Sequence, residues 1–232
     1  MKTGQNEIRA RWAVARWLAA IALALLLVTT NVRITANSLW LYEQLFERNE
    51  VPLRSGISMP VLRDIGEQIQ DYFASDTEPL EVIAKLNGVE VTLFDQDEVS
   101  HMADVKQLFG WTYLVQTLSA VVLIVVGLFT FFNLGRNALK HVALGVERGA
   151  LIASSVIIII GSASLVAFNQ VFLLFHFIGF PQGNFTFDSR TAYLVRVFPS
   201  GFWEDITFAI GALTLIEAAS LFGIAFALKR RT

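Results

Sequence analysis

The chain has 232 residues, of which 54% are hydrophobic and 16% are charged, and its formal net charge is −2. An average soluble domain contains about 25% charged residues, so this composition excludes a disordered chain and predicts an integral membrane protein. The absence of cysteine excludes a thiol enzyme and a disulfide scaffold, and the slightly acidic balance argues against a nucleic-acid partner.

Four segments are long and apolar enough to cross a membrane, which takes about 20 mostly apolar residues. The first could also be a cleaved signal peptide, but Ile34-Thr35-Ala36 is a poor cleavage site and three more candidate spans follow it, so we expect a retained helix. The four candidate spans are residues 13–34, 111–134, 151–173 and 206–228.

The distribution of charge along the chain predicts its orientation, because lysine and arginine collect in short cytoplasmic flanks. Basic residues precede the first span, separate the second from the third and follow the fourth, which places both termini in the cytoplasm. On the other side, residues 34–110 hold 14 acidic and 5 basic side chains, a balance of −9. We therefore expect a multi-pass membrane protein whose larger polar segment is extracytoplasmic.

In chain order we expect residues 1–34 to form a cytoplasmic N-terminus and the first transmembrane helix, and residues 35–110 an extracytoplasmic domain. Residues 111–134 are the second helix, 135–150 a cytoplasmic loop, and 151–180 a third helix that reaches the outer interface. Residues 181–205 form an outer loop with an interfacial helix, and 206–232 form the fourth helix with a cytoplasmic C-terminus.

The outer segment shows helical patterns first. Leu39, Tyr42 and Phe46 follow helical spacing, so we expect the first helix to continue outward. Pro60 opens a second helix whose apolar face is predicted to hold Val61, Ile65, Ile69 and Phe73.

A hairpin and a long helix complete the outer segment. Asn87-Gly88 is the dipeptide of a type I′ turn, and Val89, Val91 and Leu93 alternate after it. Asp95 and Glu98 resemble a capping box, so a helix begins there and runs into the second span. The predicted fold class is an all-α integral membrane protein with four transmembrane helices and a small extracytoplasmic α/β domain between the first two. In the second outer loop, Asp188 is expected to cap a short helix that ends at Pro199.

Two of the three histidines fall near the same membrane face. His101 precedes the second span, and His176 lies 25 residues past Leu151, about 38 Å along a straight helix. Histidine is the natural general acid or base near neutral pH, so the two together favour proton-transfer chemistry on a lipid group. Each could instead be structural, and with Asp104 they could form a zinc site, although no metal is expected. His141 is expected to be a solvated side chain of the cytoplasmic loop.

Three acidic residues near or within the spans need an explanation. Glu98 and Asp104 lie three residues on either side of His101, where either could orient its ring; for Glu98 the cap role already suffices. Glu217 lies within the fourth span, where a carboxyl group is costly. It could relay protons, but because it stands alone we expect a hydrogen bond to a serine or threonine such as Ser162 or Ser164.

The residues around both histidines resemble a known family. Glu98-Val-Ser-His101-Met-Ala-Asp104-Val-Lys106 is similar to the E-x-x-H-M-x-D-V-K stretch of the bacterial lipoprotein intramolecular transacylase (Lit) family. The second signature of that family resembles Phe175-His176, Phe180, Gly183-Asn184, Asp188 and Phe198-Pro199. The resemblance extends to four spans, one outer domain and one short outer loop.

The resemblance implies an acyltransferase that acts on membrane-anchored lipoproteins. Such an enzyme moves the sn-2 acyl chain of a diacylglyceryl-modified cysteine to that cysteine's own α-amino group. His176 would act as the base for the amine and His101 would protonate the leaving oxygen, or the reverse, with Asp104 or Glu98 orienting His101. Asn184 or Lys106 could donate to the developing oxyanion. The partners implied are lipidated lipoprotein N-termini and membrane lipids.

No cofactor is expected, because the ester and the amine belong to one substrate molecule and no energy-rich group is needed. A non-catalytic membrane protein whose outer domain binds an envelope partner is the main alternative, and a lipid-ester hydrolase is another. The non-catalytic alternative predicts histidines on opposite sides of the bundle. The catalytic one needs both imidazoles to face one cleft that opens to the outer leaflet, within about 8 Å of each other. The sequence makes no prediction of oligomeric state.

Overall fold

The computed structural model describes residues 2–231, and it describes side chains for residues 10–230. The chain divides into two compact units, which are built from segments far apart in the sequence. The first unit comprises residues 1–32, 112–161 and 210–232, and the second comprises residues 33–111 and 162–209.

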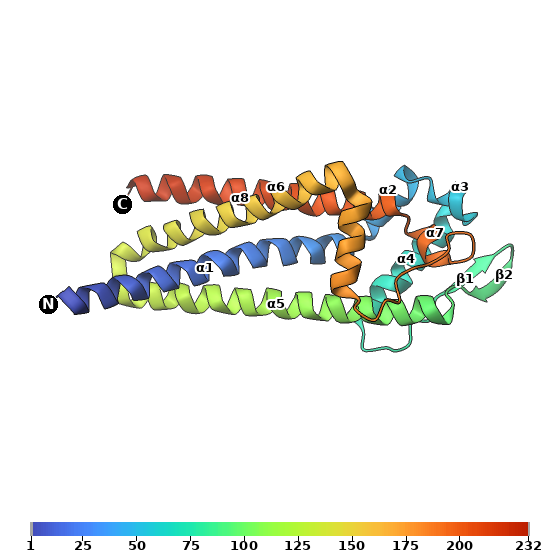
Figure 1. The fold of residues 1–232 in the computed structure, drawn as a ribbon, viewed down its shortest axis with the longest axis horizontal. Coiled ribbons are helices and arrows are strands. Elements are labelled where there is room, and N and C mark those ends of the chain that lie inside the picture. Colours follow the sequence, from blue (N-terminus) through green and yellow to red (C-terminus); the bar gives the residue numbers. More distant parts are fainter. Residues whose placement is uncertain (1, 232) are drawn as a thin grey trace. The chain divides into compact units, whose positions relative to one another are not determined.

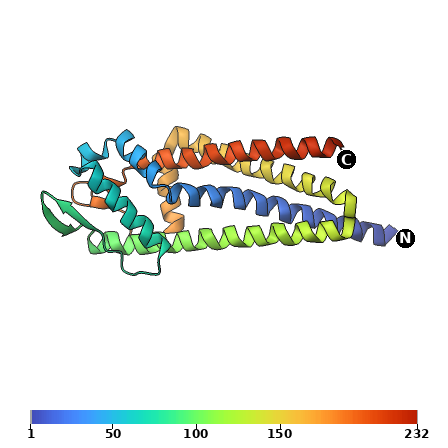
Figure 2. The same ribbon diagram turned by 180° about the vertical axis from the view of Figure 1, so that it is seen from behind.

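The first unit is a bundle of four helical segments that lie side by side (Figures 1 and 2). They belong to α1 (Lys2–Ala36), α5 (Gln96–Leu134), α6 (Ala138–Gly179) and α8 (Ser200–Arg231). Their shared core combines leucines of α1 with alanines of α6 and α8. The small side chains let α1 and α6 approach closely: a Cβ added at Gly149 would lie 2.9 Å from the carbonyl oxygen of Ala20.

Three stretches of the described residues are long and apolar enough to cross a membrane, namely Ala10–Ala36, Gln96–Gly179 and Ser200–Arg230. The second is 84 residues long and contains both α5 and α6. Between them the chain reverses through the short 3₁₀ helix η1 (Gly135–Asn137), where Gly135 has a φ of 51°. This turn lies at the same end of the bundle as the start of α1 and the end of α8 (Figure 1).

Glu217 of α8 has a hydrogen-bond partner inside this bundle. Asn31 of α1 donates from Nδ2 to Glu217 at 2.7 Å and to the hydroxyl of Thr214 at 3.1 Å. The partner of the carboxyl group is therefore an amide from another helix, where we expected a serine or threonine. Asn31 and Thr214 are completely buried, so this polar contact ties α1 to α8 in an apolar environment.

The second unit begins with three short helices. These are α2 (Leu39–Arg48), α3 (Val51–Ser55) and α4 (Met59–Ala74), and α2 packs on α4. The expectation that the first helix continues outward is wrong, because α1 ends at Ala36 and Ser38 caps a new helix by accepting from the amide of Leu41. The chain can therefore change direction before α2.

The buried face of α4 matches the predicted face in the middle of the helix but differs by one residue at each end of the helix. Leu62, Ile65, Ile69 and Tyr72 are buried, while Val61 and Phe73 are only partly so. The prediction used steps of four residues, and a helix has 3.6 residues per turn, so the error accumulates over the length of the helix. An aromatic cluster fills the rest of this core, formed by Tyr42, Phe46, Phe198 and Phe202.

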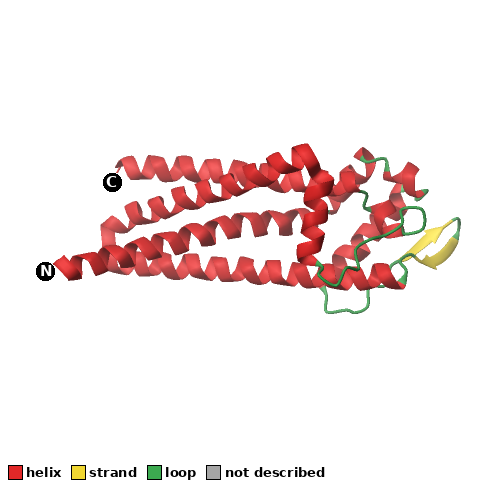
Figure 3. Ribbon diagram, in the orientation of Figure 1, coloured by secondary structure: helices red, strands yellow, loops and turns green. Residues whose placement is uncertain are grey.

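The predicted hairpin is confirmed. Strands β1 (Ile83–Leu86) and β2 (Val89–Thr92) pair antiparallel, and the turn residues Asn87 and Gly88 have φ values of 51° and 85° (Figure 3). Gln68 of α4 bonds both the amide and the carbonyl of Ile83. The β structure found in the described residues is limited to this two-stranded sheet.

Two further features position the functional residues. The capping box at the start of α5 is confirmed: Asp95 accepts from the amide of Glu98 at 2.9 Å, and Glu98 accepts from the amide of Asp95 at 2.8 Å. α6 has non-helical backbone angles at Ala167, so it is not the straight helix assumed in estimating the position of His176. The short helix α7 (Tyr193–Val197) follows in the loop after α6.

Candidate functional site

The two histidines that the sequence singles out lie next to each other in the second unit. His101 projects from the second turn of α5, and His176 from the last turns of α6. Their ring centroids are 6.0 Å apart and their planes differ by 16°, so the imidazoles are nearly parallel. The separation of 6.0 Å is shorter than the distance of about 8 Å over which two side chains can share one substrate.

Phenylalanine side chains surround both rings. The ring of Phe180 is 4.6 Å from His101 and 5.3 Å from His176, so it touches both. Others contact one histidine each: Phe187 packs on His101, while Phe172, Phe175 and Phe185 pack on His176. The apolar enclosure strengthens electrostatic interactions between the imidazoles and any bound group.

His101 is the more enclosed of the two, with 6% of its surface exposed. Burial, together with the nearby His176, lowers the pKa of His101 from 6.5 to about 4, although the Asp104 carboxylate acts in the opposite direction. His101 is therefore neutral at physiological pH. Its Nδ1 atom is buried and has no hydrogen-bond partner among the described residues, so one ring nitrogen is left unsatisfied.

His176 has a defined hydrogen bond. Its Nδ1 lies 2.8 Å from the carbonyl oxygen of Phe172, one turn earlier in α6. Because a carbonyl oxygen only accepts, this contact assigns the proton to Nδ1 in the neutral ring. The lone pair of Nε2 is then free, which is the arrangement that a general base needs.

Glu98 lies near His101 in sequence, but the contacts of its carboxylate are with the backbone. Besides capping α5, it accepts from the amide of Leu194 in α7 at 2.6 Å. Burial raises the pKa of Glu98, and the amide donors partly offset this. With 1% of its surface exposed, the side chain joins α5 to the loop that carries α7.

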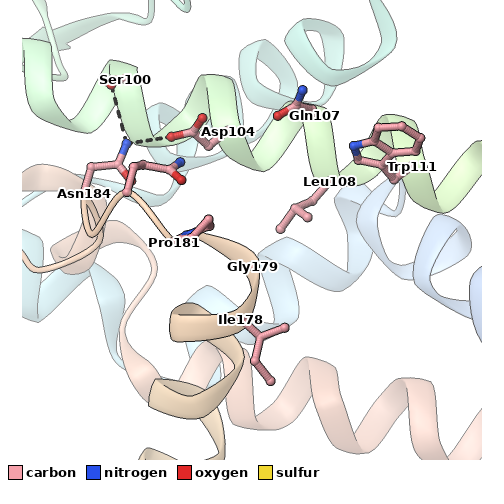
Figure 4. A pocket seen from close by; sticks show the side chains of 10 residues that line it. Ser100, Asp104, Gln107, Leu108, Trp111, Ile178, Gly179, Pro181 and Asn184 are labelled. Atoms are coloured by element: carbon pink, nitrogen blue, oxygen red, sulfur yellow. Dashed lines mark hydrogen bonds between the residues drawn. The ribbon is translucent and has the colours of Figure 1, made fainter.

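Asp104 and Asn184 come together from α5 and from the turn after α6. Asn184 donates from Nδ2 to Asp104 at 2.6 Å, with a longer contact of 3.5 Å to Ser100 (Figure 4). These three residues form part of the lining of a pocket of about 540 Å³. The walls of this pocket are one face of α5, the end of α6 and the turn that follows it.

Lys106 has its contacts in another part of the unit. Its ammonium donates to the carbonyl of Thr77 at 2.6 Å, pairs with Glu78 at 3.4 Å and lies 4.0 Å from the centre of the Tyr72 ring. These contacts tie α5 to the segment after α4. No group of three histidine or carboxylate side chains that could hold a metal ion is found in the described part of the chain.

Sequence reasoning missed the phenylalanines that enclose the histidines. The sequence assigns no role to Phe172, Phe185 or Phe187, and it singles out Phe175 and Phe180 only through the family resemblance. A local signal was available, since Phe172, Phe175 and Phe180 all lie within four residues of His176. Helical neighbours three and four residues apart share a face, which favours their contact with its ring.

Comparison with known proteins gives one family and one fold. The family model described as lipoprotein intramolecular transacylase Lit matches residues 17–203. A search of curated proteins finds no match. The chain is similar in fold to the solved membrane-integral Lit structure from Bacillus cereus, with a TM-score of 0.77 and 15% identity over 96% of this chain and 99% of that one. A structure of a mutant of the same protein gives a TM-score of 0.78 and 13% identity over 99% and 97% of the two chains.

Proposed function

Because the chain belongs to the Lit family of lipoprotein intramolecular transacylases, we propose that it is an O-to-N acyltransferase acting on lipidated lipoprotein N-termini. Its substrate is a diacylglyceryl-modified N-terminal cysteine. The sn-2 acyl chain moves to the α-amino group of the same cysteine, and the product is an N-acyl, S-monoacylglyceryl lipoprotein. The observation that carries this proposal is the 6.0 Å separation of His101 and His176.

The reaction needs two proton transfers, and the two imidazoles supply them. The amine nitrogen attacks the ester carbonyl carbon and forms a C–N bond. The bond between that carbon and the sn-2 oxygen of the glyceryl group then breaks. An ester and an amine thus become an amide and a hydroxyl group. Nε2 of His176 takes the proton that the attacking nitrogen loses, because its Nδ1 is engaged with Phe172. The protonated His176 passes this proton through His101 to the departing glyceryl oxygen, so both rings are neutral again at the end of the step.

Holding the reacting groups together is the larger part of the catalysis. Ester and amine are attached to one cysteine, so the enzyme has only to select the conformation in which they meet. Asn184 contacts Asp104 and Ser100 in the pocket that these three residues help to line. An N–H group of its side-chain amide can donate to the developing oxyanion there. Lys106, held by Thr77 and Glu78, is the weaker candidate for that role.

The topology that we propose has four spans. The apolar stretch Gln96–Gly179 is folded back at η1, so it supplies two of them. The turn η1, which contains Arg136, lies at the same end of the bundle as the start of α1 and the end of α8 (Figure 1), and the positive-inside rule assigns this basic end to the cytoplasm. His101 then precedes the second span by about three turns of α5, at the extracytoplasmic interface where lipidated cysteines lie.

The test is the chemical form of lipoprotein N-termini in cells with and without this chain. The transfer conserves the mass of the lipopeptide, so the readout is the position of the acyl chains. Mild alkali removes both ester-linked chains from the substrate but leaves one amide-linked chain on the product, and tandem mass spectrometry locates it on the nitrogen. We expect the N-acyl form only in cells that contain the chain.

Two other outcomes would contradict the proposal. A loss of one acyl mass with a free amine retained would identify a lipid-ester hydrolase, in which water replaces the amine. An unchanged diacyl form in cells that contain the folded chain would favour a non-catalytic protein whose outer segment binds an envelope partner.

A further inference from the structure

The pocket beside the histidines carries an inference about substrate recognition. Asp104 follows His101 by three residues in α5, and Gly179 follows His176 by three residues in α6. Three residues advance a helix by about 4.5 Å. Neither histidine lines the pocket, but each lies within one helical turn of a residue that does. With a volume of about 540 Å³, the pocket has the size of a site for a small ligand or a short peptide segment.

The lining of the pocket mixes polar and apolar side chains. Asp104, Gln107 and Leu108 line it from α5, and Ile178 and Asn184 line it from the end of α6 and the turn that follows (Figure 4). Ten residues line it, and none of them is a lysine or arginine. A pocket with one carboxylate, several amides and apolar side chains matches a ligand that is cationic at one point, peptide-like beside it and attached to lipid.

Asp104 has unused capacity to accept hydrogen bonds. A carboxylate can accept about four, and the described residues supply one, from Asn184 at 2.6 Å. None of the ion pairs formed within the described residues involves Asp104, and the nearby Lys106 is paired with Glu78. Asn184 also has an Oδ1 atom without a partner among the described residues. Asp104 therefore has acceptor capacity left beyond its bond from Asn184, and the buried Asn184 Oδ1 has no donor, so a cationic N–H group at this wall would satisfy both.

We propose that this pocket binds the free α-ammonium group and the first peptide bonds of the lipidated cysteine, with the Asp104 carboxylate accepting from the ammonium. This inference rests on the proposed function and names the part of the substrate that the site recognises. It makes Asp104 a substrate-binding residue, in place of a residue that only orients the His101 ring. The ammonium is held within reach of the histidines, so that it loses its proton only when it is positioned for attack.

The experiment is a binding measurement with a lipopeptide that cannot react. Ether links replace both esters of the diacylglyceryl group, and the peptide is prepared in two forms, one with the free α-amine and one with hydrogen in place of the amino group. We expect the full-length protein in detergent to bind the amine form about tenfold more tightly, the size of effect of one charge-assisted hydrogen bond.

Variants of Asp104 separate charge from folding. Asp104→Asn keeps an oxygen for Asn184, so the pocket wall is preserved while the charge is removed. It should lose the preference for the amine form and bind the desamino form as the wild type does, and Asp104→Glu should restore part of the preference. Glu90→Gln is the control, because it removes one negative charge from an exposed position of β2.

The outcomes distinguish this inference from the proposed function. Equal binding of the two lipopeptides by the wild type would overturn the inference, as would an Asp104→Asn variant that keeps the preference or weakens both ligands equally. Acyl transfer on the ester lipopeptide would still support the proposed function in those cases. A clear preference for the amine without any acyl transfer would support the pocket assignment and contradict the transacylase activity.

Discussion

His101 and His176 share a side-chain type but differ in their surroundings. One ring is buried against phenylalanines with a free Nδ1, and the other donates from Nδ1 to the carbonyl of Phe172. The hydrogen bond gives His176 the tautomer of a general base, whereas burial keeps His101 neutral. Two identical groups can therefore take different parts in one proton transfer.

Separate replacement of the two histidines tests this division of roles. We expect His101→Ala and His176→Ala each to lower the rate of acyl transfer by at least about 10²-fold, the usual contribution of a general acid or base. The rate is measured with purified protein and a diacylglyceryl lipopeptide. His141→Ala is the matched control, because His141 lies in the first unit against Trp12 and should leave the rate unchanged. Full activity in either of the first two variants would rule out the pair.

The lowered pKa of His101 also predicts how stability depends on pH. The unfolded chain takes up a proton on this residue near pH 6.5, but the folded chain does so only near pH 4. Protonation therefore favours unfolding, and the stabilising contribution of the neutral ring is complete above about pH 6.5 and is lost as the pH falls towards 4. Thermal unfolding in detergent should show a steeper loss of stability over this interval in the wild type than in His101→Gln. Parallel curves for the two proteins would contradict the shift.

At the scale of elements, the site depends on how α5 and the segment around α7 are joined. Glu98 caps α5 through the amide of Asp95 and accepts from the amide of Leu194 in α7. The same helix carries His101 one turn later. A single buried carboxylate thus links the start of α5 to the loop that follows α6.

Removal of this carboxylate should destabilise the second unit. Glu98→Ala removes a cap and leaves the Leu194 amide without its acceptor, and we expect a loss of about 2–4 kcal/mol in the free energy of unfolding. Asp97→Ala is the control, because Asp97 is an exposed acid in the same first turn and its loss should cost less than about 1 kcal/mol. Glu98→Gln keeps a carbonyl oxygen and should recover part of the stability. Chemical unfolding followed by circular dichroism measures the stability of all three variants. Equal losses of stability in Glu98→Ala and Asp97→Ala would contradict the linking role of the Glu98 carboxylate.

On the scale of the whole molecule, the proposed topology separates a basic end of the bundle from an acidic segment. Residues 34–110 carry a balance of 5 basic against 14 acidic side chains, while arginine and lysine lie in the flanks assigned to the cytoplasm. The excess of lysine and arginine in the short flanks of the spans sets the orientation of a membrane protein. The orientation can therefore be tested independently of the proposed activity.

The absence of native cysteine makes this topology accessible to single-cysteine labelling. Glu90→Cys lies on the exposed hairpin and Asn137→Cys in the exposed turn η1. A membrane-impermeant maleimide applied to intact protoplasts should label the first variant, and should label the second only after the membrane is permeabilised. Labelling of Asn137→Cys in intact protoplasts would reverse the proposed orientation.

The sequence by itself determined the features that depend on neighbouring residues: the apolar helices, the Asn87-Gly88 turn and the Asp95–Glu98 capping box. These rest on periodicity and on contacts within four residues, which a linear pattern records. The choice of His101 and His176 as a pair also came from the sequence, through topology and the family resemblance.

Only the tertiary structure decided which groups surround those residues. The bond from Leu194 to Glu98 joins residues 96 apart, Asn184 to Asp104 joins residues 80 apart, and Asn31 to Glu217 joins residues 186 apart. No local pattern encodes such pairings, because a side chain's partner depends on how distant helices pack. The same packing encloses the histidines in phenylalanine, and it therefore decides their protonation.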